Sequence, residues 1–284
     1  MTLRNGLTRP VLRNGPHSNS LSVRKNYAAT YDTYYSKQEG YSNRDAFGLF
    51  NTHNDRKESD LIVVLDLDEC LVHSQFLNSG PEVYRQDEER PQSHAFKHNE
   101  EAQSIIPSAC ESFRISLPDG DLVHVNKRPN LDTFLRNITQ KYETHIFTAA
   151  MEVYAAPLLD KLDPKGKMFS QRYYREHCTF DPSLGVYVKD LKRAMQQHSD
   201  AEQVMNEARV VLIDNNPMSF LANPMNGILV SSFYDDPKDD TLLAVMELLN
   251  ELDKEDDVRP VLDEKFGLKD ALKEAVSGAN AAWK

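Results

Sequence analysis

The sequence predicts an α/β fold in which a Rossmann-like parallel sheet is flanked by helices. Short apolar runs rich in β-branched residues occupy residues 61–65, 210–213 and 228–230, and stretches with the apolar spacing of helices lie among them. Continuous apolar runs are typical of strands that are buried on both faces of a parallel sheet. The intervening helices would provide the crossover connections that parallel strands require.

The elements follow from these patterns in chain order. The first strand, residues 61–65, ends at Asp66, and Asn130 is expected to cap the first helix. Three helices are predicted from apolar residues that recur on one face of each. The buried face of the first would be Leu131, Phe134, Leu135 and Ile138, and that of the second Tyr154, Leu158, Leu159 and Leu162. The buried face of the third would be Leu242, Val245, Met246, Leu249 and Leu252. Three further strands are expected at Thr144–Thr148, Val210–Ile213 and Ile228–Val230.

Composition divides the chain into three parts. Residues 1–58 are polar, basic at their start and without sustained periodicity, which predicts a flexible arm. Residues 59–254 carry the predicted sheet and helices, and residues 255–284 form an acidic extension that becomes weakly helical from Glu264 to Val276. Residues at about 77–125 form an insertion that contains a β-hairpin with an Asp119-Gly120 turn. No large cap domain is expected.

Charge and apolar content exclude several classes of protein. The 284 residues are 40% apolar, which is enough for a buried core, and the formal net charge is −11 at pH 7. An acidic chain disfavours direct binding of nucleic acid or of anionic membranes. The longest apolar run before a charge, Leu61–Leu65, is far too short to cross a bilayer. Cys70, Cys110 and Cys178 are expected to be thiols, and the chain is compatible with a monomer.

Two carboxylates follow the first buried strand directly, in Asp66-Leu-Asp68-Glu-Cys70. Ligands of a parallel sheet bind beyond the carboxyl ends of its strands, so both carboxylates can face that cleft. Such oxygen donors suit Mg²⁺, which prefers one or two carboxylates together with waters and a substrate phosphate. Acidic residues are also common in ordinary strand-to-helix loops, so the pair alone is weak evidence for a catalytic site.

Three later features strengthen this interpretation. Asp214 and Asn215 follow another buried strand, and Asp214 could supply a second carboxylate to a metal. Thr148 ends a strand, where its hydroxyl could donate to a phosphate oxygen, and Lys189 could neutralise the charge of a phosphoryl group. Each residue has an ordinary structural explanation by itself. Their order along the chain indicates a phosphate site.

Four segments carry a resemblance to a known family. DLDECLVHS at 66–74, FTAA at 147–150, YVKDL at 187–191 and LIDNNP at 212–217 resemble the four ordered motifs of the haloacid dehalogenase (HAD) superfamily. More narrowly, they resemble its branch of phosphatases that act on the C-terminal domain of RNA polymerase II, with their small and Dullard-like relatives. The resemblance runs from about Leu61 to Leu252 and implies a HAD fold.

The resemblance implies a Mg²⁺-dependent protein serine/threonine phosphatase that forms a phospho-aspartate. In such an enzyme Asp66 attacks phosphorus, while Asp68 protonates the leaving serine oxygen and later deprotonates the hydrolytic water. Thr148 and Lys189 would hold the phosphoryl oxygens. The metal ligands would be Asp66, the carbonyl of Asp68, Asp214 and, nearby, Asn215.

Three further residues match this branch less sharply. Phe76 and Tyr154 align with an apolar pocket for substrate residues near the phosphoserine, and Arg175 matches an arginine that contacts substrate. Ordinary packing explains the two aromatic residues equally well. The sequence also departs from the branch, because Cys70 stands where Thr is usual and Ala150 where Ser is usual. Neither is a proposed nucleophile, so activity is expected to survive.

Two other functions are alternatives. A non-catalytic HAD-like scaffold, such as a mitochondrial translocase subunit, would explain the basic start of the chain as a presequence, although Asp66 and Asp68 are both retained. A phosphatase of small phosphorylated metabolites is disfavoured because an open cleft suits a peptide better. The expected partner is a phosphorylated protein or peptide, such as the RNA polymerase II C-terminal domain. The expected compartment is the nucleus or cytoplasm, with the mitochondrion as the alternative.

Overall fold

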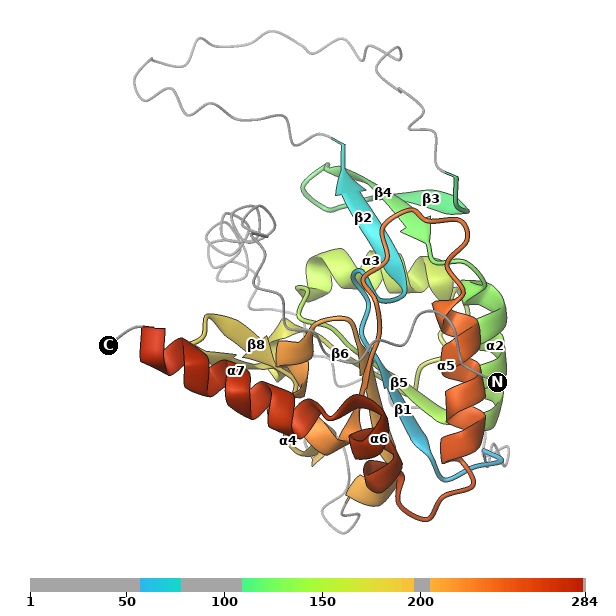
Figure 1. Ribbon diagram of the computed structural model, residues 1–284. Coiled ribbons are helices and arrows are strands. Elements are labelled where there is room, and N and C mark those ends of the chain that lie inside the picture. Colours follow the sequence, from blue (N-terminus) through green and yellow to red (C-terminus); the bar gives the residue numbers. More distant parts are fainter. Residues whose placement is uncertain (1–56, 78–108, 197–204, 283–284) are drawn as a thin grey trace, which may run out of the picture. The chain divides into compact units, whose positions relative to one another are not determined.

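The computed structural model describes residues 57–77, 109–196 and 205–282 (Figure 1). The predicted arm, apart from residues 57 and 58, and the polar stretch 78–108 of the insertion lie outside these ranges. The strands are β1 (Ile62–Leu65), β2 (Val72–Phe76), β3 (Ser112–Ser116), β4 (Leu122–Lys127), β5 (Glu143–Phe147), β6 (Gln171–Tyr173), β7 (Thr179–Asp181), β8 (Val186–Val188), β9 (Val210–Asp214) and β10 (Gly227–Leu229). The α-helices are α2 (Leu131–Lys141), α3 (Glu152–Leu162), α4 (Leu191–Gln196), α5 (Thr241–Leu252), α6 (Val258–Phe266) and α7 (Leu268–Ala282).

A five-stranded parallel sheet forms the centre of this structure, with the strand order β10-β9-β1-β5-β6. In register, Leu65 of β1 lies between Ile146 of β5 and Ile213 of β9. Val63, Val64 and Leu65 of β1 and all residues of β9 are fully buried, as the continuous apolar runs of the two strands predict. The predicted fold class, an α/β fold with a parallel sheet, is confirmed.

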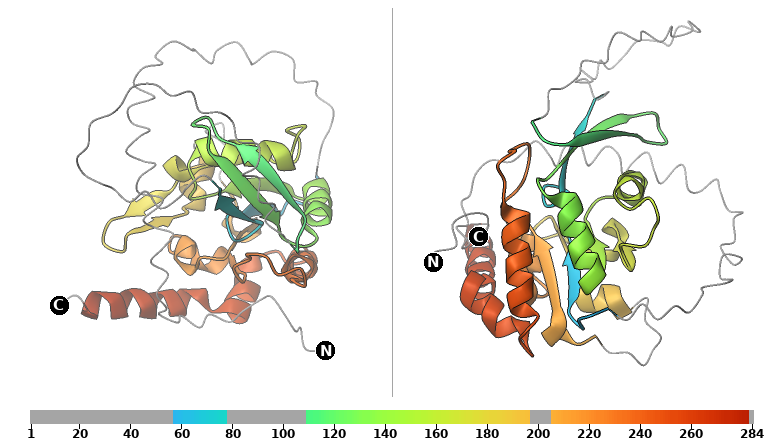
Figure 2. Two further views of the ribbon diagram at one scale, coloured as in Figure 1. Left: turned by 90° about the horizontal axis from the view of Figure 1, so that it is seen from above. Right: turned by 90° about the vertical axis from the view of Figure 1, so that its right-hand side faces the viewer.

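Helices cover both faces of the sheet. α2 and α5 contact each other and lie side by side on one face, whereas α6 and α7 lie on the other side, beside β10 (Figures 1 and 2). The predicted helical spacing corresponds to the buried sides of α2 and α5, where Phe134 and Leu249 are both 0% exposed. The core therefore fills the space between the sheet and these helices.

Asn130 does not cap α2 in the way that the sequence predicts. It precedes the helix, but its φ of 67° is left-handed and its side chain accepts no hydrogen bond from the first turn. Its main-chain carbonyl instead accepts from the N–H of Phe134 at 2.8 Å. A side-chain cap needs an extended backbone at the capping residue, which the conformation of Asn130 does not provide.

The insertion contributes a second, antiparallel sheet with the order β2-β4-β3. The predicted hairpin is β3 and β4, and Gly120 occupies the turn between them with a φ of 91°, which favours glycine. Residues 72–76 form β2, a strand that was not predicted from the sequence. Within the ranges that the structure describes, the insertion adds no helical cap domain.

Two helices follow the predicted domain boundary at residue 254. The weak helix expected from 264 to 276 is broken at Gly267, whose φ of 59° ends α6 before α7 begins. Leu262 and Phe266 of α6 and Leu268 and Leu272 of α7 are at most 4% exposed and belong to the main core. Among the described residues, none of the helices combines the length and the apolar character needed to cross a membrane.

Candidate active site

Three polar residues meet where the strands of the parallel sheet end. Asp66 directly follows β1, Thr148 follows β5, and Asp214 is the last residue of β9. Because these strands are parallel neighbours, their carboxyl ends lie at one edge of the sheet. Asp66 is 6% exposed, Thr148 1% and Asp214 0%, so polar groups gather here in a buried position.

Lys189 joins the two carboxylates. It follows β8 and is 1% exposed, and its Nζ donates to Asp66 Oδ1 at 2.5 Å and to Asp214 Oδ2 at 2.6 Å. Burial alone would lower the pKa of this lysine, but the charges of Asp214 and Asp66 outweigh burial and raise it. The ammonium group is therefore fixed as a cation at the edge of the sheet.

Asp66 has an unusual electrostatic environment. Burial first, and then the negative charge of Asp214, raise the pKa of Asp66 from 3.8 to about 8, and Lys189 offsets these effects only in part. Two carboxylates share one ammonium group, so the buried cluster carries excess negative charge. A further cation would reverse this imbalance and favour the ionised form of Asp66.

Asp68 lies in the tight turn that follows Asp66 and is held by a tyrosine. Glu69 has a φ of 57°, and its N–H donates to the Val72 carbonyl at 2.7 Å, which folds the chain back into β2. The hydroxyl of Tyr154 on α3 lies 2.6 Å from Asp68 Oδ1 and 2.6 Å from Ser74 Oγ. Burial, followed by the charge of Asp68, raises the pKa of Tyr154 well above 10. Tyr154 therefore stays protonated and donates to the carboxylate.

Asn215 connects Asp66 to the turn. In the amide orientation that satisfies both of its ends, its nitrogen donates to Asp66 Oδ2 at 3.1 Å and to the Asp68 carbonyl at 3.2 Å. Its oxygen then accepts from Ser232 Oγ at 3.0 Å. The four residues predicted as metal ligands, Asp66, Asp68, Asp214 and Asn215, are thus linked directly or through Lys189.

These residues fit a hard divalent cation. Two buried carboxylates, a main-chain carbonyl and an amide offer oxygen donors, which Mg²⁺ prefers. Across the part of the chain that the structure describes, no group of three or more His, Cys, Asp or Glu side chains could hold a metal. A cation at this edge of the sheet would therefore complete its coordination with water or substrate phosphate, as Mg²⁺ commonly does.

The remaining predicted site residues border this cluster. The Thr148 Oγ1 accepts from the Ala150 N–H at 3.0 Å, which leaves its own proton for a phosphoryl oxygen. The Arg175 Nε donates to the Ala149 carbonyl at 2.7 Å, beside Thr148. Phe76 of β2 stacks on Tyr154, with 5.8 Å between the ring centroids. Phe76 and Tyr154 thus form an aromatic pair next to Asp68, a contact that ordinary packing also produces, and their role in binding substrate stays a prediction.

The two departures from the usual motifs have small structural effects. Cys70 is fully buried and its Sγ makes only a weak contact, at 3.8 Å, with the Ile213 carbonyl. Burial, followed by the charge of Asp66, raises its pKa, so it remains a thiol. Ala150 still donates its N–H to Thr148, a bond that needs no side chain. All three cysteines are free, as predicted.

Arg128, which no sequence pattern singles out, anchors the turn after Asp66. Its guanidinium is 1% exposed, donates to the Cys70 carbonyl at 2.9 Å, and forms a two-point pair with Asp239 at 2.8 Å for each bond. A lone arginine beside a proline gives no sign of these partners, because Asp239 is 111 residues away.

Comparison with known proteins decides the family. The sequence model of the NLI interacting factor-like phosphatase family matches residues 61–259. The chain belongs to this family. The predicted resemblance is confirmed, and the predicted enzyme class, a phosphoprotein phosphatase, is that of the family.

The phosphatase is similar to several curated proteins. It is 34% identical over 209 residues to the "CTD nuclear envelope phosphatase 1 homolog" of Drosophila melanogaster. The match covers 72% of this chain and 73% of that protein. It is 38% identical over 202 residues to the "Probable C-terminal domain small phosphatase" of Dictyostelium discoideum, covering 71% and 54%. It is 35% identical over 202 residues to the human "CTD small phosphatase-like protein", covering 70% and 59%.

Proposed function

We propose that this phosphatase hydrolyses phosphoserine or phosphothreonine esters in proteins, with Mg²⁺ as cofactor and Asp66 as nucleophile. One observation carries the proposal: Asp66, Asp214 and Lys189 meet at the carboxyl edge of the sheet, with Nζ within 2.6 Å of both carboxylates. Phosphoryl transfer asks a protein mainly for positioning and for neutralisation of charge. This cluster offers a nucleophile and a fixed cation together.

The chain's own residues account for both chemical steps. An Oδ atom of Asp66 attacks phosphorus, and the bond from phosphorus to the serine oxygen breaks while that oxygen takes a proton from Asp68. Asp68 then removes a proton from water, whose oxygen attacks the phospho-aspartate, releases inorganic phosphate and restores Asp66. Tyr154, hydrogen-bonded to Asp68 Oδ1, keeps the acid and base group in place through both steps.

Other groups bind the phosphoryl oxygens. Lys189 and the hydroxyl of Thr148 stabilise their charge during transfer. The metal would be held by Asp66, the Asp68 carbonyl, Asp214 and Asn215. Bound there, Mg²⁺ would add positive charge at the phosphoryl oxygens and keep Asp66 ionised.

The substrate follows from the site and from the relatives. Several relatives are named as CTD phosphatases, which supports a phosphorylated protein tail, such as that of RNA polymerase II, as substrate. Relatives named for the nuclear envelope support the nucleus as the compartment, and they give no support to the cytoplasm or the mitochondrion. The names of these relatives give no support to a metabolite substrate or to a non-catalytic scaffold. The expectation of a monomer stays a prediction.

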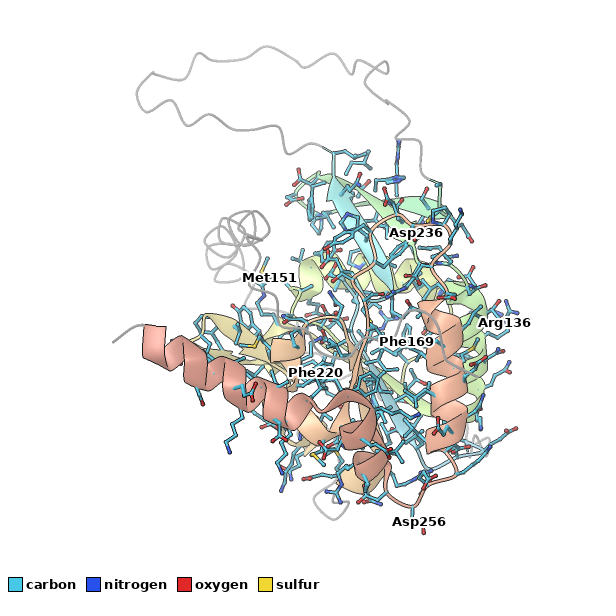
Figure 3. All side chains as sticks on the ribbon, in the orientation of Figure 1. Arg136, Met151, Phe169, Phe220, Asp236 and Asp256 are labelled. Atoms are coloured by element: carbon cyan, nitrogen blue, oxygen red, sulfur yellow. The ribbon has the colours of Figure 1, made fainter. Side chains whose placement is uncertain are left out.

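The test is phosphate release from a serine-phosphorylated polymerase-tail peptide and from an aryl phosphate. Wild type should release phosphate from both with Mg²⁺ and stop when EDTA is added. Asp66→Asn, a nearly isosteric change, should lose turnover on both. Asp256→Asn is the matched control, because Asp256 is exposed near the opposite end of the sheet (Figure 3). Full activity of Asp66→Asn, or activity of wild type in EDTA, would overturn the mechanism.

A further inference from the structure

An aromatic platform stands on the hairpin that leads to Lys189. We use this name for Phe180 of β7, Tyr187 of β8 and Arg175, which lies shortly before β7. Phe180 and Tyr187 are a cross-strand pair, with ring centroids 5.0 Å apart. The guanidinium of Arg175 lies 5.1 Å from the centroid of the Tyr187 ring. Phe180 is 51% exposed, the highest value among the large apolar residues of the described ranges.

The platform is continuous with the phosphoryl site. Lys189 directly follows β8 and comes two residues after Tyr187, so the end of one strand joins the platform to the ammonium group. A strand advances about 3.3 Å per residue, which places these two Cα atoms roughly 7 Å apart. Arg175 makes a second connection, because it bonds to the Ala149 carbonyl next to Thr148. The platform therefore begins where the phosphate-binding residues end.

Arg175 has no carboxylate partner among the described residues, whereas Arg128, Arg172 and Arg209 each pair with an aspartate. Arg114, Arg136 and Arg193 form no such pair either, so what distinguishes Arg175 is its place over the Tyr187 ring and beside Thr148. A single exposed apolar side chain is ordinary on a protein surface. An exposed Phe that packs on a second ring, with an unpaired guanidinium beside it and an active site at its edge, has the composition of a contact surface for peptide.

We propose that the aromatic platform binds the polypeptide that flanks the phosphorylated residue, with Phe180 contacting an apolar side chain two or three residues away. An extended peptide also advances about 3.3 Å per residue, so two to three residues span the path from the phosphoryl site to Phe180. The inference rests on the proposed function and extends it. It makes Phe180 a determinant of which phosphoserines are hydrolysed.

The experiment compares two phosphoserine peptides with wild type and Phe180→Ala. One peptide has only glycine, serine and alanine around the phosphoserine, and the other has leucine at the second and third positions on both sides. Wild type should favour the leucine peptide by about five-fold in kcat/KM, equivalent to about 1 kcal/mol, through a lower KM. Phe180→Ala should reduce this preference to about one, since the apolar contact is lost.

The controls separate the platform from the chemistry. Leu243→Ala removes another exposed apolar side chain, 41% exposed on α5, and should keep the wild-type preference. Phe180→Tyr keeps the ring and should keep the preference, and Phe180→Gln, which removes the ring at an exposed position and should lose the preference, replaces the alanine variant if that variant does not fold. If wild type shows no preference for the leucine peptide, or if Phe180→Ala keeps the full preference, the proposed role of the platform in peptide binding is wrong. If wild type hydrolyses neither peptide nor an aryl phosphate, the proposed function fails and the platform falls with it.

Discussion

The ammonium group of Lys189 is buried with two carboxylates that have few other counter-ions. Lys189→Met keeps most of the side-chain length and removes the charge. We expect kcat/KM for a phosphopeptide to fall by about 100-fold or more, because the phosphoryl group loses a fixed cation. The free energy of unfolding should fall by about 3 kcal/mol, since two buried carboxylates lose their partner. Steady-state kinetics and urea unfolding measure the two effects.

Lys192→Met provides the matched control for this change. Lys192 is exposed on α4, only three residues along the chain, and pairs with no carboxylate in the described structure. The Lys192→Met variant should keep the kinetics and the free energy of unfolding of wild type. Wild-type kcat/KM in Lys189→Met would remove the lysine from the proposed phosphate site.

Tyr154 has two roles that a single substitution can separate. Tyr154→Phe keeps the ring that stacks on Phe76 and removes the hydroxyl that bonds to Asp68. We expect kcat to fall by about ten-fold, the order of one hydrogen bond to a charged group, because the acid and base group is held less firmly. KM for an aryl phosphate should change little.

Tyr234→Phe is the control for this loss of a hydroxyl, since Tyr234 is 49% exposed. Unchanged kcat in Tyr154→Phe would limit Tyr154 to packing against the substrate.

The positions of Asp66, Thr148 and Asp214 could be predicted from sequence because each follows an apolar strand, and parallel strands end at a common edge. The contacts of Lys189 could not. Its two partners lie 123 and 25 residues away, and a hairpin of two three-residue strands leads to it. The same holds for the Tyr154 hydroxyl, which meets Asp68 across 86 residues. Spacing patterns describe one element at a time, whereas these contacts join several.

Among the elements, the buried strands were predictable and the short ones were not. β1 and β9 carry apolar runs of four residues, and β5 ends in the apolar pair Ile146-Phe147, whereas β6, β7 and β8 have only three residues each, too few for a period to appear. β2, with the sequence VHSQF, mixes polar and apolar residues, and four of its five residues are only partly buried, so it shows no continuous apolar run. The position of Gly267 explains why one predicted helix is two.

The edge strand β10 depends on a glycine that helices approach closely. A Cβ at Gly227 would lie 2.5 Å from Leu268 Cδ1 and 2.6 Å from Phe220 Cδ1, and Phe220 is fully buried (Figure 3). We expect Gly227→Ala to lower the free energy of unfolding by about 1–3 kcal/mol through overpacking. Denaturant unfolding at a fixed pH measures the loss.

A double substitution tests the cause of that loss. Leu268→Ala removes one of the two clashing groups, so Gly227→Ala should cost less in its presence than in the wild-type background. If the two substitutions lowered the free energy of unfolding by strictly additive amounts, Leu268 of α7 would not be in close contact with position 227 of β10.

The whole molecule is acidic, with a net charge of −11. One of its carboxylates, that of Asp66, is buried in the candidate active site, where ionisation is unfavourable. In the metal-free protein the pKa of Asp66 is raised from 3.8 to about 8. Between these two values the folded state holds a proton that the unfolded chain releases, so the free energy of unfolding falls as pH rises through this window. Asp239 and Asp253 have lowered pKa values and so lose their stabilising effect only under more acidic conditions.

Binding of Mg²⁺ should reverse this loss, because the cation binds the ionised carboxylate and competes with the proton. We expect Mg²⁺ to raise the melting temperature more at about pH 8 than at about pH 5.5, with EDTA samples of equal ionic strength as reference. Asp66→Asn removes the titrating group. Its metal-free form should melt above metal-free wild type at about pH 8, and its gain from Mg²⁺ should be smaller. An equal gain for wild type at both pH values would show that the cation does not bind at Asp66. A larger gain at about pH 8 would support the proposed cation site, because the cation would then offset the cost of the ionised carboxylate in the folded state.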